Sequence, residues 1–309
     1  MRLVIALGGN ALLRRGEPMT PDTQRANVRV AVQAIAPIIL RNEVVITHGN
    51  GPQIGLLALQ QTSVAAPDRF PLDVLGAETE GMIGYLIEQE LDNALPSGKP
   101  VASLLTRVVA DRRDPAFHNP TKFVGPVYDD EKIIDIGHRQ GWLFRRDGAG
   151  WRRVVPSPAP LRILEARVIS LLVEQGVTVI CAGGGGIPVI QGADGNEIGV
   201  EAVIDKDHAS ALLAGLIGAD GLIMLTDVAA VALDFGTPNA RAIRHATPAM
   251  LADYAFPAGS MGPKVEAACA FVNETGGFAA IGALEEVAAI LDCAAGTRID
   301  QFAKTLETV

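Results

Sequence analysis

The chain has 309 residues and carries 26 basic against 35 acidic side chains, a formal net charge of −9 at pH 7. Hydrophobic residues at 49% and charged residues at 20% are typical of a packed globular protein, which excludes collagen-like, coiled-coil and intrinsically disordered architectures. The acidic balance, without a long run of Lys or Arg, disfavours nucleic acid and anionic membranes as partners. Any anionic ligand must therefore meet local hydrogen-bond donors.

The cysteines and the hydrophobic stretches indicate in which cellular compartment the protein is found. Cys181, Cys269 and Cys293 are odd in number and form no CxxC pair, which argues against a zinc site and predicts buried free thiols in a reducing compartment. The most hydrophobic stretch, residues 211–225, is broken by Asp220 and three glycines and is too short to span a bilayer. No signal-like segment is apparent, so we expect a soluble cytoplasmic protein.

Short continuous apolar runs alternate with longer segments rich in Ala, Leu and Val. The runs are expected to form strands at residues 3–7, 44–47, 177–181 and 222–225. Helices are expected at residues 22–40, 78–95, 161–175, 207–216 and 263–274. Continuous apolar strands are typical of a parallel sheet covered on both faces, so the class is α/β. In such sheets ligands bind where strands end and helices begin.

Residues 111–158 interrupt this alternation. They are rich in proline and glycine and hold both tryptophans, and Asp147-Gly148 separates two segments that alternate apolar and polar side chains. This pattern predicts a β-hairpin. We expect a single domain over residues 1–309, with an inserted excursion at about residues 111–158.

Two glycine-rich loops each follow a predicted strand and precede a helical pattern. The first loop contains Gly8, Gly9 and Asn10, and the second contains Gly49, Asn50 and Gly51. Glycine lets consecutive backbone N–H groups approach an oxyanion. A plain strand-to-helix turn is the favoured explanation of the first pair taken alone, but two such loops together favour an anion site. His48 has no second histidine at metal-ligand spacing, which favours a structural hydrogen-bonding role.

A third loop places four consecutive glycines, residues 183–186, directly after a predicted strand. A packing role would need one or two glycines, and each glycine costs conformational entropy on folding. We therefore expect Gly184 and Gly185 to admit a charged ligand close to the backbone.

The chain contains six lysines, of which Lys99, Lys132 and Lys304 have ordinary polar surroundings and are expected at the surface. The other three lie where the backbone is restricted: Lys122 between two prolines, Lys206 between two carboxylates and Lys264 directly after Gly262-Pro263. Proline suits the first position of a helix, so Lys264 is expected to project from a helix start. Together with the glycine loops, these lysines indicate a polyanion held at strand ends, as phosphoryl transfer requires.

Familiar phosphate-binding signatures are absent from the sequence. It contains no GxxxxGK[ST] motif and no HRD or DFG set, and the loop at Gly49 does not match the dinucleotide-binding GxGxxG. P-loop enzymes and protein kinases are therefore excluded, and a dehydrogenase is disfavoured.

The chain resembles the amino acid kinase family, and within it the members that act on carbamate. The resemblance rests on ALGGNA (residues 6–11), THGNGPQ (47–53), GMIGY (81–85), NPTK (119–122), GGGGIP (183–188), VIDKD (203–207) and GSMGPK (259–264). It runs nearly end to end and implies a three-layer αβα sandwich around a mainly parallel sheet, with a protruding subdomain, and a homodimer. It also implies reversible transfer of phosphate between carbamoyl phosphate and MgADP, giving ATP.

The same resemblance assigns roles to individual residues. The substrate side would comprise Gly8, Gly9, Asn10, Gly49, Asn50, Gly51, Gly184 and Gly185. The nucleotide side would comprise Thr226, Asp227, Met261, Gly262 and Lys264. The catalytic residues would be Lys122, Lys206, Asp207 and Lys264, and no protein ligand to a metal is expected. Carbamate is already an anion and needs no general base, so Asp207 would orient the lysines.

Two other functions stay open at this point. One is a kinase of the same fold acting on another small carboxylate, such as an acetylated amino acid. Many relatives have a lysine before the first glycine pair where this chain has Ala6, and Lys122 would compensate in a carbamate-type enzyme. The other is a nucleotide-binding regulator without catalysis, which the presence of all three unusual lysines argues against. The sequence leaves open the direction of flux and a role in arginine or purine breakdown.

Overall fold

The structure is a computed structural model that describes residues 1–13, 16–65, 68–129, 137, 141–257 and 259–309. Its largest sheet contains β1 (Arg2–Leu7), β2 (Glu43–His48), β3 (Val101–Ser103), β9 (Thr178–Ile180), β12 (Gly221–Thr226), β13 (Ala232–Leu233), β14 (Arg241–Ala246), β15 (Phe278–Ala283), β16 (Thr297–Ile299) and β17 (Glu307–Thr308). The strand order is β13-β14-β16-β15-β12-β1-β2-β9-β3, with β17 paired to β14. Neighbouring strands from β15 to β3 all run parallel, as the continuous apolar runs predicted.

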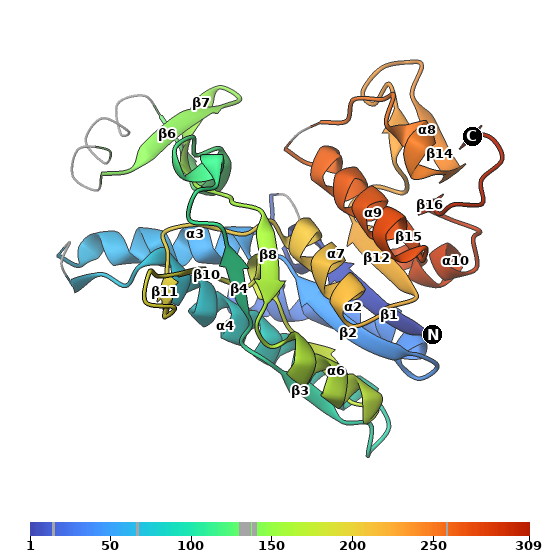
Figure 1. Ribbon diagram of the computed structural model, residues 1–309, viewed down its shortest axis with the longest axis horizontal. Helices are drawn as coiled ribbons and strands as arrows, with labels where there is room; N and C mark the ends of the chain where they lie inside the picture. The colour runs from blue at the N-terminus through green and yellow to red at the C-terminus, as the bar shows by residue number, and fades with distance from the viewer. Residues whose placement is uncertain (14–15, 66–67, 130–136, 138–140, 258) are drawn as a thin grey trace.

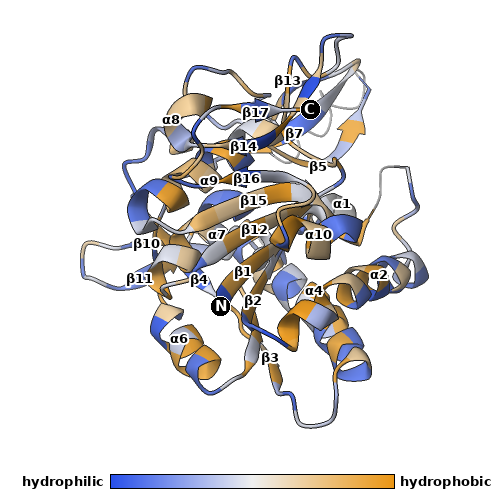
Figure 2. Ribbon diagram, turned by 90° about the vertical axis from the view of Figure 1, so that its right-hand side faces the viewer, coloured by the Kyte–Doolittle hydropathy of each residue, from blue (hydrophilic) through white to orange (hydrophobic). Residues whose placement is uncertain are grey.

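Helices cover both faces of this sheet. One face carries α2 (Pro21–Ile39), α4 (Leu72–Ala94) and α10 (Val287–Leu291), and the other carries α6 (Ala166–Glu174), α7 (Lys206–Leu216) and α9 (Met261–Thr275). Figure 2 shows the strands between these two helical layers. Alternate residues of β1 supply the two cores: Leu3 and Ile5 pack against α2 and α4, while Val4 packs on the opposite side. The predicted three-layer αβα architecture is therefore confirmed.

Two smaller sheets lie beside the large one. One has the order β11-β10-β4-β8 and the other the order β5-β7-β6. Their strands are β4 (Arg107–Ala110), β5 (Lys122–Tyr128), β6 (Leu143–Asp147), β7 (Gly150–Val155), β8 (Pro160–Ile163), β10 (Ile187–Gln191) and β11 (Glu197–Gly199). The predicted hairpin is β6–β7, closed where Asp147 pairs with Gly150. We call the β5-β7-β6 sheet the arm; its β6–β7 end projects from the body (Figure 1).

The arm is joined to the body by a small apolar core and by close backbone packing. Val124 and Val155 of the arm pack with Ile54 of α3 (Gly51–Gln60) and with Leu72 of α4. A Cβ atom added to Gly55 of α3 would lie 2.4 Å from the Cα atom of Gly125 in β5, so the two backbones can approach this closely only because residue 55 is a glycine. These contacts fix the base of the arm above α3.

Some predicted helix boundaries are wrong. The helix expected at residues 161–175 begins at Ala166, because residues 160–163 form β8, an antiparallel partner of β4. The helix expected to start at residue 78 begins at Leu72, and α9 begins at Met261, which places Pro263 at its third position. A proline is still tolerated there, because the first-turn N–H groups have no intrahelical acceptor.

The expectation for the cysteines is only partly correct. All three are free thiols, but only Cys181 is buried; Cys269 is half-buried and Cys293 is exposed. Across the part of the chain that the structure describes, no helix has the length and apolar character needed to cross a membrane.

Candidate active site

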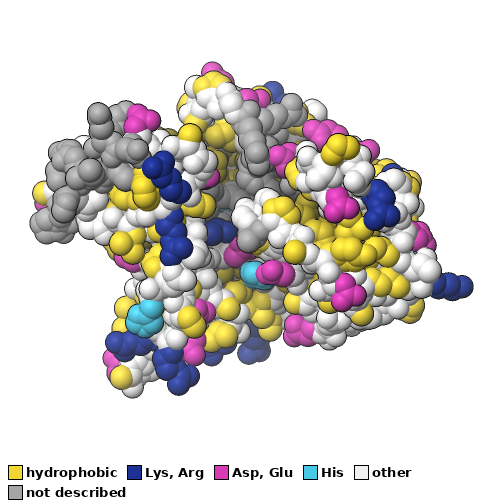
Figure 3. Space-filling view, turned by 90° about the horizontal axis from the view of Figure 1, so that it is seen from above, with side chains coloured by type: hydrophobic (Ala, Val, Ile, Leu, Met, Phe, Trp, Pro, Cys, Tyr) yellow, Lys and Arg dark blue, Asp and Glu magenta, His cyan; other side chains and the backbone are white. Residues whose placement is uncertain are grey.

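The predicted site residues gather at the carboxyl ends of the parallel strands. Gly8 follows β1, Gly49 follows β2, and Asp227 follows β12, while Lys206 and Lys264 lie in the first turns of α7 and α9. Viewed from above, the surface is hollowed between the arm and the lobe that carries α8 (Pro248–Leu251) and α9 (Figure 3). The strand-end location expected for ligands in this class of sheet is therefore where these residues meet.

The first two glycine loops pack directly against each other. A Cβ atom on Gly49 would lie 2.9 Å from the backbone nitrogen of Gly9, and one on Gly8 would lie 2.8 Å from the carbonyl oxygen of Leu225. The N–H groups of Gly8 and Gly49 donate to the carbonyl oxygens of Leu225 and Leu7, at 2.9 and 3.0 Å. These two N–H groups extend the sheet ladder and so are not available to an anion.

The remaining residues of these loops start short helices. Gly9 begins α1 (Gly9–Leu12), and Gly51 begins α3 after the N-cap Asn50. The side chain of Asn50 is buried and donates to Thr79 Oγ1 at 2.9 Å, which ties the second loop to α4. The side chain of Asn10, another predicted substrate residue, lies outside the part that the structure describes.

The four-glycine loop has a packing explanation that the sequence did not indicate. Added Cβ atoms would meet His48 at Gly183, Asn50 at Gly184, the Ile204 carbonyl oxygen at 2.2 Å from Gly185, and Val108 at Gly186. Gly184, Gly185 and Gly186 also have positive φ angles of 67°, 97° and 87°. The expectation that packing would need only one or two glycines is wrong, and the loop alone no longer indicates a ligand.

Three charged side chains form the centre of the site. Lys206 is the first residue of α7, and its Nζ lies 3.0 Å from Asp207 Oδ1. Lys264 reaches across from α9 and donates from Nζ to Asp207 Oδ2 at 2.8 Å. One carboxylate therefore holds two ammonium groups that come from different helices.

Burial and the neighbouring charges shift the pKa values of Lys206 and Asp207. Burial lowers the pKa of Lys206, with the Lys264 charge acting in the same direction, while the Asp207 carboxylate opposes both. Burial would raise the pKa of Asp207, but the charges of Lys206 and Lys264 outweigh it and hold that pKa well below its usual range. Asp207 is thus a poor proton acceptor, and the cluster carries more positive than negative charge, which suits an anionic ligand.

The third unusual lysine approaches from the arm. Lys122 begins β5, and its Nζ lies 2.5 Å from Oδ2 of Asp205, the N-cap residue of α7. No role for Asp205 was predicted from the sequence, although an aspartate just before a helix is a common N-cap residue. Lys304 is exposed and Lys99 half-buried, in keeping with surface positions, whereas Lys132 lies outside the described residues.

The predicted nucleotide residues lie near Lys264 in the fold. Thr226 ends β12 and donates from its hydroxyl to Asp227 Oδ1 at 3.1 Å. Met261 and Gly262 begin α9, and the N–H of Gly262 donates to the Pro257 carbonyl oxygen at 2.9 Å. These residues stand beside the cluster on neighbouring elements.

Two buried titratable side chains, His48 and Glu80, contact the backbone around the glycine loops. Burial lowers the pKa of His48 to about 4, and its Nδ1 lies 3.3 Å from the Gly49 carbonyl oxygen, in line with the predicted structural role. Glu80 of α4 accepts the N–H groups of Gly183 at 2.8 Å and Thr106 at 3.1 Å, and burial raises its pKa to about 8 despite these bonds. No sequence signal distinguishes Glu80, because glutamate within a helix is normally exposed.

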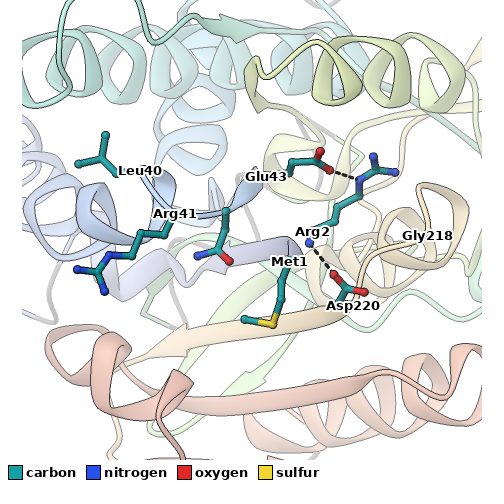
Figure 4. Close-up of a pocket in the computed structure, with 8 residues that line it drawn as sticks. Met1, Arg2, Leu40, Arg41, Glu43, Gly218 and Asp220 are labelled. Carbon is teal, nitrogen blue, oxygen red and sulfur yellow. Dashed lines mark hydrogen bonds and ion pairs between the residues drawn. The ribbon is translucent and has the colours of Figure 1, made fainter.

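A separate hollow of about 520 Å³ lies at the opposite ends of the strands. It is lined by residues that include Met1, Arg2, Glu43 and Asp220. Figure 4 shows two interactions of Arg2 in this hollow: it donates from Nε to Glu43 at 2.8 Å and from its backbone nitrogen to Asp220 at 2.7 Å. It has no part in the strand-end site.

The chain is similar to known proteins over nearly its whole length. Residues 1–281 match the model of the amino acid kinase family. The carbamate kinase of Rhizobium meliloti is 58% identical over 301 residues, covering 97% of this chain and 93% of that protein. The carbamate kinase of Escherichia coli K12 is 50% identical over 297 residues, covering 96% and 98%. The solved structure of a Giardia lamblia carbamate kinase bound to AMP-PNP superposes with a TM-score of 0.88 at 41% identity, covering 97% and 98%.

Proposed function

The chain belongs to the amino acid kinase family, and from that premise we propose how it works as a carbamate kinase. Carbamate kinase activity is its function, which makes it a phosphotransferase. We propose that it transfers a phosphoryl group reversibly between carbamoyl phosphate and MgADP, giving ATP and carbamate. The observation that carries this proposal is the Lys206–Asp207–Lys264 cluster at the strand ends.

The proposed mechanism depends on alignment and charge. In the direction of carbamate phosphorylation the attacking atom is an oxygen of an anion, so no group has to remove a proton. Lys206 and Lys264 would neutralise charge on the transferring phosphoryl group, and Asp207 would fix their positions through its two oxygens. The low pKa of Asp207 supports this orienting role, because an ionised carboxylate can hold both lysines while a protonated one cannot.

The two substrates would occupy opposite sides of the cluster. The loops at Gly9, Asn50 and Gly51 are proposed for carbamoyl phosphate, with Lys122 facing it from the arm. Thr226, Asp227, Met261, Gly262 and Lys264 are proposed for the nucleotide. Magnesium usually binds through substrate phosphates and only one or two carboxylates. No group of three or more His, Cys, Asp or Glu side chains in the described part of the chain could hold a metal, so we propose that Mg²⁺ enters with the nucleotide.

The packing of the glycine loops limits the roles proposed for four of the predicted substrate residues. Gly8, Gly49, Gly184 and Gly185 are proposed to shape the floor of the site through close packing of their backbones. Direct hydrogen bonds to phosphate would come from other groups.

The experiment that tests the function is ATP formation from carbamoyl phosphate and MgADP by the purified protein. We expect the wild type to form ATP rapidly. Lys206→Ala should lose this activity, and Lys304→Ala, which changes an exposed lysine, should keep it. A folded protein without activity on carbamoyl phosphate would contradict the proposal. Activity on an acetylated amino acid instead would identify the chain as a same-fold kinase of another carboxylate.

We also propose that the protein is a homodimer formed at the β3 edge of the sheet. β3 is the last strand in the order of the large sheet, and a hollow of about 480 Å³ beside it is lined by Met82, Leu104 and Leu105, among others. Leu105 is 54% exposed and Tyr85 on α4 is 53% exposed. Apolar side chains gathered at the end of a sheet fit a second copy of the same surface.

The cellular setting is a further part of the proposal. Free thiols persist in a reducing cytoplasm, and three unpaired cysteines fit that compartment. We propose that the enzyme works there in arginine metabolism, where carbamoyl phosphate would arise from the breakdown of a nitrogen-rich compound.

A further inference from the structure

Asp205 makes two different kinds of contact with its two carboxylate oxygens. Oδ1 accepts the N–H groups of Asp207 at 2.9 Å and His208 at 3.4 Å, which caps the first turn of α7. Oδ2 lies 2.5 Å from Lys122 Nζ on the arm. Only the first contact is needed to begin the helix, so the second requires its own explanation.

The Lys122–Asp205 pair connects the arm to the residues of the central cluster. Asp205 directly precedes Lys206, and its Oδ1 is bonded to the backbone of Asp207, whose side chain holds Lys206 and Lys264. The Asp205 side chain is 14% exposed and that of Lys122 38% exposed, so the pair lies at the margin of the site. Burial would raise the pKa of Asp205, but the Lys122 charge opposes it and the pKa lies below its usual value.

A lysine at the start of a strand on a projecting arm has many conformations. Holding such a side chain in one place costs conformational entropy, and a partly exposed ion pair contributes little to overall stability. The pair therefore affects where the ammonium group of Lys122 is found more than how stable the fold is. This ordering matters for phosphoryl transfer, where small displacements of a charged group reduce the rate.

We infer that Asp205 is a positioning residue, which holds the Lys122 ammonium group at the N-terminus of α7 so that it faces the anionic substrate alongside Lys206 and Lys264. The inference rests on the proposed function, in which Lys122 contacts the phosphoryl donor. Asp205 itself touches the reacting groups only through Lys122 and through the first turn of α7.

A double-mutant cycle in the ATP-forming assay tests the inference. Asp205→Asn keeps a cap oxygen but removes the charge that attracts Lys122, so it is expected to lower kcat/KM for carbamoyl phosphate at least tenfold. In a Lys122→Ala background the same substitution is expected to change kcat/KM less than threefold, because its target is gone. Glu197→Gln removes an ion pair between β11 and Arg107 of β4, which contacts neither Lys122 nor the lysine cluster, and is expected to leave kcat/KM unchanged.

A second measurement does not depend on activity. The rate at which acetic anhydride labels Lys122, followed by mass spectrometry, is expected to rise at least threefold in Asp205→Asn and to stay unchanged in Glu197→Gln. An unchanged labelling rate, or an equal loss of kcat/KM with and without Lys122, would overturn the inference and leave Asp205 as a helix cap alone. If the wild-type protein forms no ATP, the proposed function is wrong, and the labelling rates still decide whether Asp205 holds Lys122.

Discussion

At the scale of single residues, the proposed mechanism depends on one carboxylate that contacts two lysines. Asp207 is 5% exposed and contacts Lys206 and Lys264 with separate oxygens. A buried charge without a partner is strongly destabilising, so neither lysine could stay in place without this carboxylate. In the proposed mechanism this geometry would supply fixed positive charge for the transferring phosphoryl group, and no general base would be needed.

Removing either lysine should affect turnover more than binding. Lys206→Ala and Lys264→Ala are each expected to lower kcat at least tenfold, which corresponds to about 1.4 kcal/mol of lost transition-state stabilisation. The measurement is steady-state ATP formation with both substrates saturating. Lys304→Ala, which changes an exposed lysine, serves as the control and should keep the wild-type kcat. Full activity in either cluster variant would remove that lysine from the mechanism.

His48 should make stability depend on pH below neutrality. Its pKa is lowered from 6.5 to about 4, chiefly by burial, so the unfolded chain binds a proton between these pH values while the folded chain does not. The His48 contribution to stability therefore falls as the pH drops through this range, because proton binding at this residue favours the unfolded state, whereas buried Glu80, with its pKa raised to about 8, contributes in the opposite direction. From pH 7 to pH 5 we expect His48 to account for a loss of about 2 kcal/mol in the free energy of unfolding.

Urea unfolding at the two pH values, for wild type and His48→Gln, measures this loss. Between pH 7 and pH 5 the stability of the wild type should fall by about this amount relative to that of the variant, because the Glu80 contribution is common to both proteins. His118→Gln, at an exposed position, should behave like the wild type. Equal losses in the wild type and in His48→Gln would show that His48 is not buried in its neutral form.

At the scale of elements, the buried parallel strands could be predicted from the sequence, whereas the packing role of the four-glycine loop could not. Parallel strands such as β1 and β12 carry apolar residues on both faces and were recognised within one or two residues. Residues 160–163 were misread as helix, because an edge strand of a small sheet has no such run; only its pairing with β4 makes it a strand. The packing role of the four-glycine loop was not apparent for a related reason: its neighbours Asn50 and Ile204 are distant in sequence.

The same holds for the candidate site. Lys206, Asp207 and Lys264 could be selected from the sequence because rare lysines stand out beside proline and carboxylates, and the structure brings these three into contact. Glu80 and Asp205 could not be selected in this way. Their importance comes from the N–H groups and ammonium group that they meet, which only the folded arrangement supplies.

The close packing of the loop at residues 183–186 predicts how a glycine substitution there changes stability. Gly185→Ala should lower the free energy of unfolding by about 3 kcal/mol, because its Cβ atom would lie 2.2 Å from a backbone oxygen and φ is 97°. Gly215→Ala in α7 is the matched control: its nearest contact would be an ordinary 3.8 Å to Glu274, so stability should stay equal or rise by up to ~1 kcal/mol. Denaturant unfolding of both variants measures the difference, and a Gly185→Ala protein as stable as the control would contradict the packing explanation.

At the scale of the whole molecule, the negative net charge disfavours the anionic ligands proposed for the site. A protein with a formal charge of −9 repels anions on average, whereas its proposed substrates are anionic. Three lysines stand at the proposed site: Lys206 on α7, Lys264 on α9 and Lys122 at the base of the arm. In the proposed site these local donors would have to overcome an unfavourable overall field.

The proposed homodimer is the prediction that concerns the whole molecule. Sedimentation equilibrium at micromolar concentration should give a mass of about 65 kDa, twice the 32.4 kDa of one chain. Leu105→Glu places a charge in the exposed apolar surface beside β3 and should shift the mass towards that of one chain, because an unpaired charge buried at an interface is costly. Phe235→Glu introduces the same charge at a residue that is 67% exposed outside this surface and should remain dimeric. A wild-type mass of one chain would refute the dimer, and a dimer unaffected by Leu105→Glu would move its interface away from the β3 edge.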